Sequence, residues 1–138
     1  MKIAYIVPAN YNVNKYIVDV EAKKGDNILG LQGEGEDSDK VGATVDNVSL
    51  KRCACGGNED AIINGGFEEG HNVGQGSGSF PKITGWDGGK YGIEIGIAFR
   101  YNAKWPQSTH VTELDSIGNT MITQTITLDS LFRVVTPK

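Results

Sequence analysis

An antiparallel β-sandwich is the fold class that this sequence predicts, and three observations support it. Apolar residues alternate with small or charged residues from position 91 to position 101, which predicts a long strand with one buried face. The stretch 122–128 alternates in the same way and carries threonines on its other face, as exposed sheet surfaces do. Nineteen glycines without a collagen-like period indicate many turns between short strands. No segment of about ten residues has a helical period, so an all-β domain is expected.

Weaker strands are expected along the rest of the chain. Residues 16–22 show a third alternation, with Tyr16, Val18 and Val20 on one face. Shorter apolar stretches predict further strands at 2–7, 27–32, 43–50, 61–64 and 110–115. Clusters of glycine, asparagine, aspartate and serine predict turns at 24–27, 33–39, 56–58 and 74–79. The last of these is expected to be a flexible surface loop, because no helix follows that could hold a phosphate.

The composition excludes several classes of function. With 138 residues the chain has the size of one domain, and its net charge of −4 with scattered lysines argues against a nucleic-acid partner. No apolar run approaches the ~20 residues that span a membrane. His71 and His110 lie 39 residues apart, and no catalytic motif surrounds either of them. We therefore expect a protein that is not an enzyme.

A change in composition at 53–60 divides the chain into two parts. Residues 1–52 and 61–138 each look like half of a sandwich, so the linker-like 53–60 joins two parts of one domain. Cys53 and Cys55 lie in this linker, where two cysteines so close together are poorly oriented for an internal bridge. Free thiols or disulfides between chains are expected instead. No signal peptide opens the chain, so a secretion signal would lie outside it.

Aromatic residues near position 100 are the candidates for ligand contact. Sugar C–H groups pack on aromatic rings, while amides bind the hydroxyl groups. Trp105 precedes a proline in a turn-like stretch, which favours exposure, and Tyr101 and Asn102 lie close to it in sequence. We predict these three as ligand-binding residues. Trp86 and Tyr91 are expected in the core.

Two stretches of the chain resemble one family of domains. Residues 62–70 contain Asn-Gly-Gly-Phe-Glu, and Gly-Trp follows at 85–86. Residues 42–50 end in Asp-Asn-Val-Ser-Leu. These motifs resemble the opening and closing strands of galactose-binding-like jelly-roll domains, which are carbohydrate-binding modules of secreted repeat and adhesin-like proteins. The resemblance implies a jelly roll, an extracellular location and a glycan partner.

The same resemblance implies a structural calcium ion. In the family such an ion commonly ties the opening strand to the closing strand, and Glu68 and Asp46 match the ligand positions. Both are carboxylates at expected strand ends, and backbone carbonyls would supply the remaining oxygens that calcium requires.

The order of the two stretches departs from the family, because the closing half (about 1–52) precedes the opening half (about 59–138). Three arrangements explain this order: a window across two tandem repeats, a circular permutant, or half-domains completed by neighbouring chains head to tail. Half a sandwich exposes an apolar face and open edges, so each half needs a complement. Closure within one chain is favoured by its high effective concentration.

Two functions follow from these observations. The first is a non-catalytic extracellular carbohydrate-binding or adhesion module with a structural calcium ion. The alternative is a structural subunit that assembles with like subunits, head to tail by strand exchange, into a filament or surface homopolymer.

Overall fold

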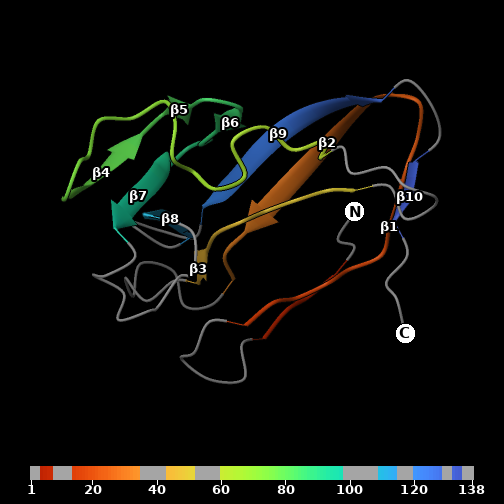
Figure 1. The fold of residues 1–138 in the computed structure, drawn as a ribbon, viewed down its shortest axis with the longest axis horizontal. Helices are drawn as coiled ribbons and strands as arrows, with labels where there is room; N and C mark the ends of the chain where they lie inside the picture. The colour runs from red at the N-terminus through yellow and green to blue at the C-terminus, as the bar shows by residue number, and fades with distance from the viewer. Residues whose placement is uncertain are drawn as a thin grey trace.

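The structure is a computed structural model that describes residues 4–7, 14–34, 43–51, 60–97, 109–114, 120–128 and 132–134. These residues form an all-β fold in which two four-stranded sheets pack as a sandwich (Figure 1). The strands are β1 (Val20–Ala22), β2 (Gly25–Gln32), β3 (Thr44–Val45), β4 (Ser77–Phe80), β5 (Lys82–Ile83), β6 (Trp86–Asp87), β7 (Ile93–Ile97), β8 (His110–Glu113), β9 (Met121–Leu128) and β10 (Phe132–Val134). The predicted antiparallel β-sandwich is thus confirmed. No helix of the described residues is long and apolar enough to cross a membrane.

All strand pairs are antiparallel. One sheet has the order β2-β9-β6-β5 and the other β3-β8-β7-β4. A separate two-stranded sheet joins β1 to β10, with Val20 opposite Val134. Its register is offset by one residue from that of the β2–β9 pair, in which Gly25 lies opposite Leu128. The β1–β10 pair is therefore a separate sheet and not an extension of the β2–β9 ladder.

The core lies between the two four-stranded sheets and is closed by the loop at 62–67. Ile93 and Ile95 of β7, together with Ile122 and Ile126 of β9, are buried at alternate positions, as a period of two requires. The remaining buried members of this cluster are Ile62, Phe67, Ile83, Trp86 and Leu114. Trp86 is 2 % exposed, which confirms that it belongs to the core.

Strands from the two halves of the chain pair with each other. β2 pairs with β9 over eight residues, and β3 pairs with β8. The backbone at the end of the first half also pairs with the backbone at the start of the second half. The Val48 amide donates to the Gly65 carbonyl and the Ala61 amide to the Leu50 carbonyl, both at 2.9 Å. In this structure β2 and β3 from the first part of the chain therefore belong to the same sandwich as β4 to β9.

Several predicted strands are shorter than expected. The 91–101 strand is β7 and begins only at Ile93, because Gly92 has φ +78° and its amide donates to the Gly88 carbonyl at 3.1 Å in a turn. Of 16–22 and 43–50 only β1 and β3 are strands. Neither 4–7 nor 61–64 is assigned to a strand.

The glycine-rich stretch 74–79 corrects the sequence-based prediction of a flexible loop. Its turn ends at Gly76, whose amide donates to the Val73 carbonyl, and Ser77 begins β4. Gly78 lies opposite Ile95 of β7. A Cβ atom there would lie 3.1 Å from Val73 and 3.2 Å from Phe80, so the small residue lets these side chains close over the strand.

Candidate functional site

The three predicted ligand-binding residues, Trp105, Tyr101 and Asn102, lie outside the described residues, as do Cys53 and Cys55. Their roles stay predictions. The two predicted calcium ligands, Glu68 and Asp46, are described and can be examined in their surroundings.

Asn64 organises the loop that carries the Asn-Gly-Gly-Phe-Glu motif. Its side-chain oxygen accepts from the amides of Glu68 (3.0 Å) and Glu69 (3.1 Å). Its side-chain nitrogen donates to the carbonyls of Glu69 and Thr84, each at 2.9 Å. Both amide protons and both oxygen lone pairs are therefore used within the protein. Its main-chain oxygen accepts from the Trp86 indole at 3.0 Å, which links the motif to the Gly-Trp at 85–86.

The next residues of the motif pack against the closing segment and the core. Gly65 lies so close to Val48 that a Cβ atom would be 1.9 Å from the Val48 carbonyl oxygen. Phe67 is fully buried, and its ring centroid lies 5.3 Å from that of Trp86. Asn64, Gly65 and Phe67 thus have structural roles in joining the two halves of the sandwich.

Glu68 binds the start of β8 through both carboxylate oxygens. Its Oε1 accepts from the amides of Thr109 (2.7 Å) and His110 (2.8 Å), and its Oε2 lies 2.6 Å from His110 Nδ1. The other ring nitrogen of His110 lies 3.0 Å from the Gly74 carbonyl. Both ring nitrogens face acceptors, which favours the doubly protonated imidazolium. Partial burial alone would lower the pKa of His110, but its bonds to Glu68 and Gly74 and the charge of Glu68 raise it overall.

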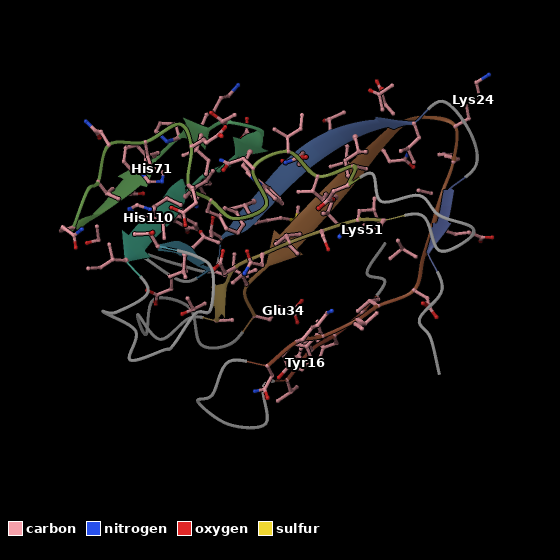
Figure 2. All side chains as sticks on the ribbon, in the orientation of Figure 1. Tyr16, Lys24, Glu34, Lys51, His71 and His110 are labelled. Carbon is pink, nitrogen blue, oxygen red and sulfur yellow. The ribbon has the colours of Figure 1, made fainter. Side chains whose placement is uncertain are left out.

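His71 lies beside this ion pair (Figure 2). The two imidazole rings meet edge to face with centroids 4.7 Å apart. His71 Nε2 donates to the Phe67 carbonyl at 2.8 Å. Its Nδ1 is buried and has no hydrogen-bond partner among the residues that the structure describes.

The surroundings of Glu68 bear on the predicted calcium ion. Calcium takes six to eight oxygen ligands, whereas the Glu68 carboxylate is occupied by three N–H donors, one of them on a protonated ring. Asp46 is half-buried at the end of β3, and its Oδ1 accepts from the Asn47 amide at 2.7 Å. A calcium ion at Glu68 would therefore have to displace His110. Within the described part of the chain, no three histidine, cysteine, aspartate or glutamate side chains are arranged to hold a metal ion.

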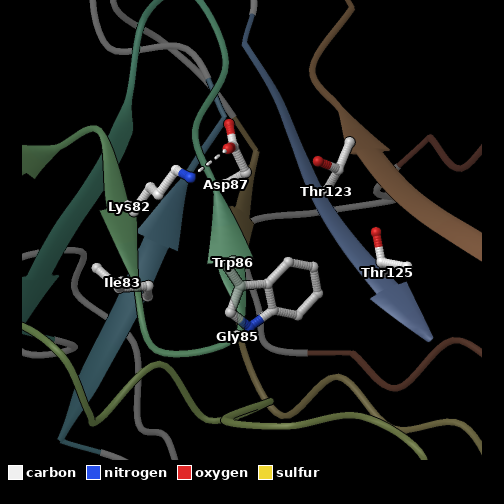
Figure 3. Close-up of a pocket in the computed structure, with 7 residues that line it drawn as sticks. All are labelled: Lys82, Ile83, Gly85, Trp86, Asp87, Thr123 and Thr125. Carbon is white, nitrogen blue, oxygen red and sulfur yellow. Dashed lines mark ion pairs between the residues drawn. The ribbon is translucent and has the colours of Figure 1, made fainter. Parts of the chain in front are cut away.

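A pocket of about 350 Å³ lies on the β2-β9-β6-β5 sheet, at its β5, β6 and β9 strands (Figure 3). It is a shallow depression that is largely open to solvent, not an enclosed cavity. Ile83 and Trp86 are buried and contribute apolar surface, and charged and hydroxyl side chains complete the lining. The lining residues are Lys82, Ile83, Gly85, Trp86, Asp87, Thr123 and Thr125.

The polar groups of the pocket are fixed by the short β5–β6 hairpin. Lys82 lies opposite Asp87, and its Nζ is 3.5 Å from Asp87 Oδ2. Asp87 Oδ1 accepts from the Gly89 amide at 2.9 Å. This hydrogen bond and the charge of Lys82 lower the pKa of Asp87, so the carboxylate is ionised at neutral pH. Both side chains are mostly exposed, with 76 % and 52 % of their surface accessible, and can reach a ligand.

Sequence reasoning did not indicate that Lys82 and Asp87 line a common pocket. They are five positions apart and become neighbours only because Thr84 and Gly85, with φ +82° at Gly85, form the turn of a two-residue hairpin. The sequence feature that could have indicated this pairing is a lysine and an aspartate on either side of a Thr-Gly turn. The threonine face of β9 was predicted as exposed sheet surface, and Thr123 and Thr125 extend the pocket from it.

No family model, no curated protein and no solved structure matched this chain.

Proposed function

We propose that this chain is a non-catalytic, extracellular carbohydrate-binding or adhesion module of the galactose-binding-like jelly-roll type. The observation that carries the proposal is the pocket beside Trp86, where an ion pair and two threonine hydroxyls adjoin apolar surface. Sugars present both hydroxyl groups and apolar C–H surface, so a pocket with both kinds of lining suits them. The motif resemblance supports the same class of ligand.

Each polar residue of the pocket is suited to a different kind of contact with a sugar. Asp87 is an ionised acceptor for sugar hydroxyl protons, and Lys82 is a charged donor to sugar oxygens. Thr125 on β9 is exposed and can donate as well as accept. Ile83 and Trp86 line the pocket but are buried, so they offer only a small apolar area to the C–H surface of the ring. Trp105, Tyr101 and Asn102 remain the predicted additional contacts.

Binding to a glycan array, followed by titration calorimetry with the strongest ligand, tests this function. Asp87→Asn keeps the acceptor for the Gly89 amide but removes the charge, and Thr125→Val removes a hydroxyl at constant shape. Each substitution is expected to weaken binding about tenfold, while Lys90→Ala on the neighbouring exposed loop leaves it unchanged.

Two results would overturn the proposal. One is an array without any glycan signal for a folded protein. The other is a glycan whose affinity is the same in wild type, Asp87→Asn and Thr125→Val, since that glycan would bind elsewhere. In the second case Trp105→Ala decides whether the predicted aromatic residue carries the binding.

A structural subunit that assembles head to tail by strand exchange is the second candidate. The outer edge of β2 favours it, because none of the described strands pairs there and Ile28 on this strand is 74 % exposed. It ranks second because β2 and β3 already pair with β9 and β8 of the same chain. Filaments in electron micrographs without a glycan signal would favour this candidate.

A further inference from the structure

The segment that follows β3 contains a motif with a defined chemistry. Asn47, Val48 and Ser49 form the triplet of asparagine, any residue except proline, and serine or threonine. In secreted proteins this triplet is the acceptor sequence for N-linked glycosylation. No other asparagine of the sequence has serine or threonine at the second position after it. Because such a triplet can arise by chance, its surroundings in the folded protein decide whether it can carry a glycan.

The triplet alternates between solvent and the core. Asn47 and Ser49 are exposed, whereas Val48 and Leu50 are half-buried and pack against the core cluster. Residues two positions apart in an extended chain lie on the same side. Asn47 has φ +51°, in the left-handed region that asparagine adopts more readily than most residues. The acceptor amide and the serine hydroxyl therefore both face outward.

The fold holds the triplet through its backbone and not through these two side chains. The Val48 amide donates to the Gly65 carbonyl at 2.9 Å, and the Asn47 amide donates to Asp46 Oδ1 at 2.7 Å. Within the described part of the chain, the side chains of Asn47 and Ser49 make no hydrogen bond. A sugar on Asn47 Nδ2 therefore breaks no contact that stabilises the sandwich.

The neighbouring Gly66 leaves space beside the acceptor. A Cβ atom at Gly66 would lie 3.8 Å from Asn47 Oδ1, so a longer side chain at this position would crowd the amide. The backbone of Gly66 is not in the left-handed region, so its conformation does not require glycine. The folded protein can accommodate a glycan on this side of Asn47.

We propose that Asn47 is an N-glycosylation site. Its Nδ2 forms a bond to the anomeric carbon of an oligosaccharide that is carried on a lipid pyrophosphate. The bond from that carbon to the pyrophosphate oxygen breaks, the lipid pyrophosphate leaves, and the amide nitrogen loses one proton to a base of the transferase. The Ser49 hydroxyl is the group that the transferase recognises two residues after the acceptor.

This inference rests on the extracellular location in the proposed function, because N-glycans are added to secreted proteins. It is independent of the pocket at β5 and β6, so the modification and the binding function can fail separately. β3 is an edge strand of its sheet, and a bulky, hydrophilic glycan two residues beyond it hinders pairing of this edge with another chain. The modification therefore favours the single-chain sandwich over head-to-tail exchange.

Secretion of the full chain from cultured mammalian cells, behind a cleavable signal sequence, tests the site. Wild type is expected to migrate more slowly in gels than the same chain made in a bacterial cytoplasm, and peptide-N-glycosidase should abolish the difference. The glycosidase converts a glycosylated asparagine to aspartate, so digestion in heavy-oxygen water should label Asn47 in peptide mass spectra. Asn72 is exposed as well but has no serine or threonine two residues on, and should stay unlabelled.

Three substitutions separate the triplet from general effects on secretion. Asn47→Asp removes the acceptor amide, and aspartate also tolerates the left-handed backbone. Ser49→Ala removes the hydroxyl at an exposed position. Each should abolish the glycosidase-sensitive shift completely, whereas Ser49→Thr keeps the hydroxyl and should retain the shift. Cell extracts are analysed together with the medium, so that a poorly secreted variant is still scored.

Either of two results excludes the site. One is a wild type without any glycosidase-sensitive shift in medium and cell extract, and the other is a shift that persists in both Asn47→Asp and Ser49→Ala. Loss of the shift in these two variants, its retention in Ser49→Thr and the isotope label at Asn47 establish the site. A glycan array without signal for a chain labelled at Asn47 would overturn the binding function alone.

Discussion

The side-chain amide of Gln124 makes two hydrogen bonds with the backbone of Ile63, 61 positions away in the sequence. Its Oε1 accepts from the Ile63 amide at 2.8 Å, and its Nε2 donates to the Ile63 carbonyl at 2.9 Å. Gln124 is 3 % exposed and occupies a core-facing position of β9 between Ile122 and Ile126. The Gln124 side chain thus satisfies the backbone amide and carbonyl of Ile63, which lies in a loop and not in a described strand.

Replacing Gln124 by leucine should destabilise the domain by about 2 kcal/mol, because both backbone groups of Ile63 lose their partner. Urea denaturation followed by tryptophan fluorescence measures the change. Thr125→Ala, at the next and exposed position of β9, should alter stability by less than about 0.5 kcal/mol. Equal stability of wild type and Gln124→Leu would mean that the two hydrogen bonds are absent in solution.

Gly65→Ala should be much more destabilising than Gly66→Ala, although the two positions are adjacent. A Cβ atom at Gly65 would lie 1.9 Å from the Val48 carbonyl oxygen, which is backbone and cannot rotate away. At Gly66 the nearest atoms are 3.7 and 3.8 Å away, an ordinary van der Waals distance. We expect a loss of about 3 kcal/mol or more for Gly65→Ala, measured by chemical denaturation.

Gly66→Ala is the matched control and should cost less than about 1 kcal/mol. Because the contact at Gly65 joins segment 1–52 to segment 61–138, the pair of variants also tests whether the halves close within one chain. Similar stabilities of the two variants would show that Val48 does not lie against Gly65.

Alternation in the sequence predicted the strands that have one buried face. β9 buries Ile122, Gln124 and Ile126 at every second position and β7 buries Ile93 and Ile95, and both strands were predicted from their alternation. The strands missed were β4, β5, β6 and β10, which have two to four residues and include Gly78 and Lys82. The pairing of β4 with β7 and of β6 with β9 depends on contacts between distant segments, which no local pattern reports.

Residues 61–64 show why an apolar stretch alone does not suffice to predict a strand. Ile62 is buried and Ile63 is 59 % exposed, so the alternation is real, yet the backbone pairs with a side chain instead of a strand. In the same way Glu68 was predicted from the motif as a metal ligand, whereas its bonds to Thr109 and His110 could not be foreseen from residues 41 and 42 positions away.

The predicted calcium ion has a direct test. If Glu68 and Asp46 bind calcium, a chelator should lower the melting temperature of protein prepared with calcium, and Asp46→Asn should abolish that response. Differential scanning calorimetry with and without added calcium measures both. Asp26→Asn, on the exposed face of β2, controls for a general effect of charge. A melting temperature indifferent to chelator would remove calcium from the description and leave Glu68 as the partner of His110.

The Glu68–His110 pair should make stability depend on pH. The pKa of His110 is raised in the folded protein, so the stabilisation from its charge is fully present below the ordinary histidine pKa of about 6.5 and is lost as the pH rises through the folded value. Glu68→Gln keeps an acceptor oxygen for the Thr109 and His110 amides but removes the charge. The destabilisation caused by this variant should be larger at about pH 5.5 than at about pH 8.5.

His71 is the other imidazole of this cluster, and its ring lies edge to face against His110. His71→Phe keeps a ring against His110 and leaves Glu68 in place, so the pH dependence that comes from Glu68 and His110 should persist in this variant. Thermal melts across this pH range, paired with histidine C–H proton shifts in NMR spectra, separate the two rings. A Glu68→Gln effect that is constant with pH would contradict a charged His110 in the folded state.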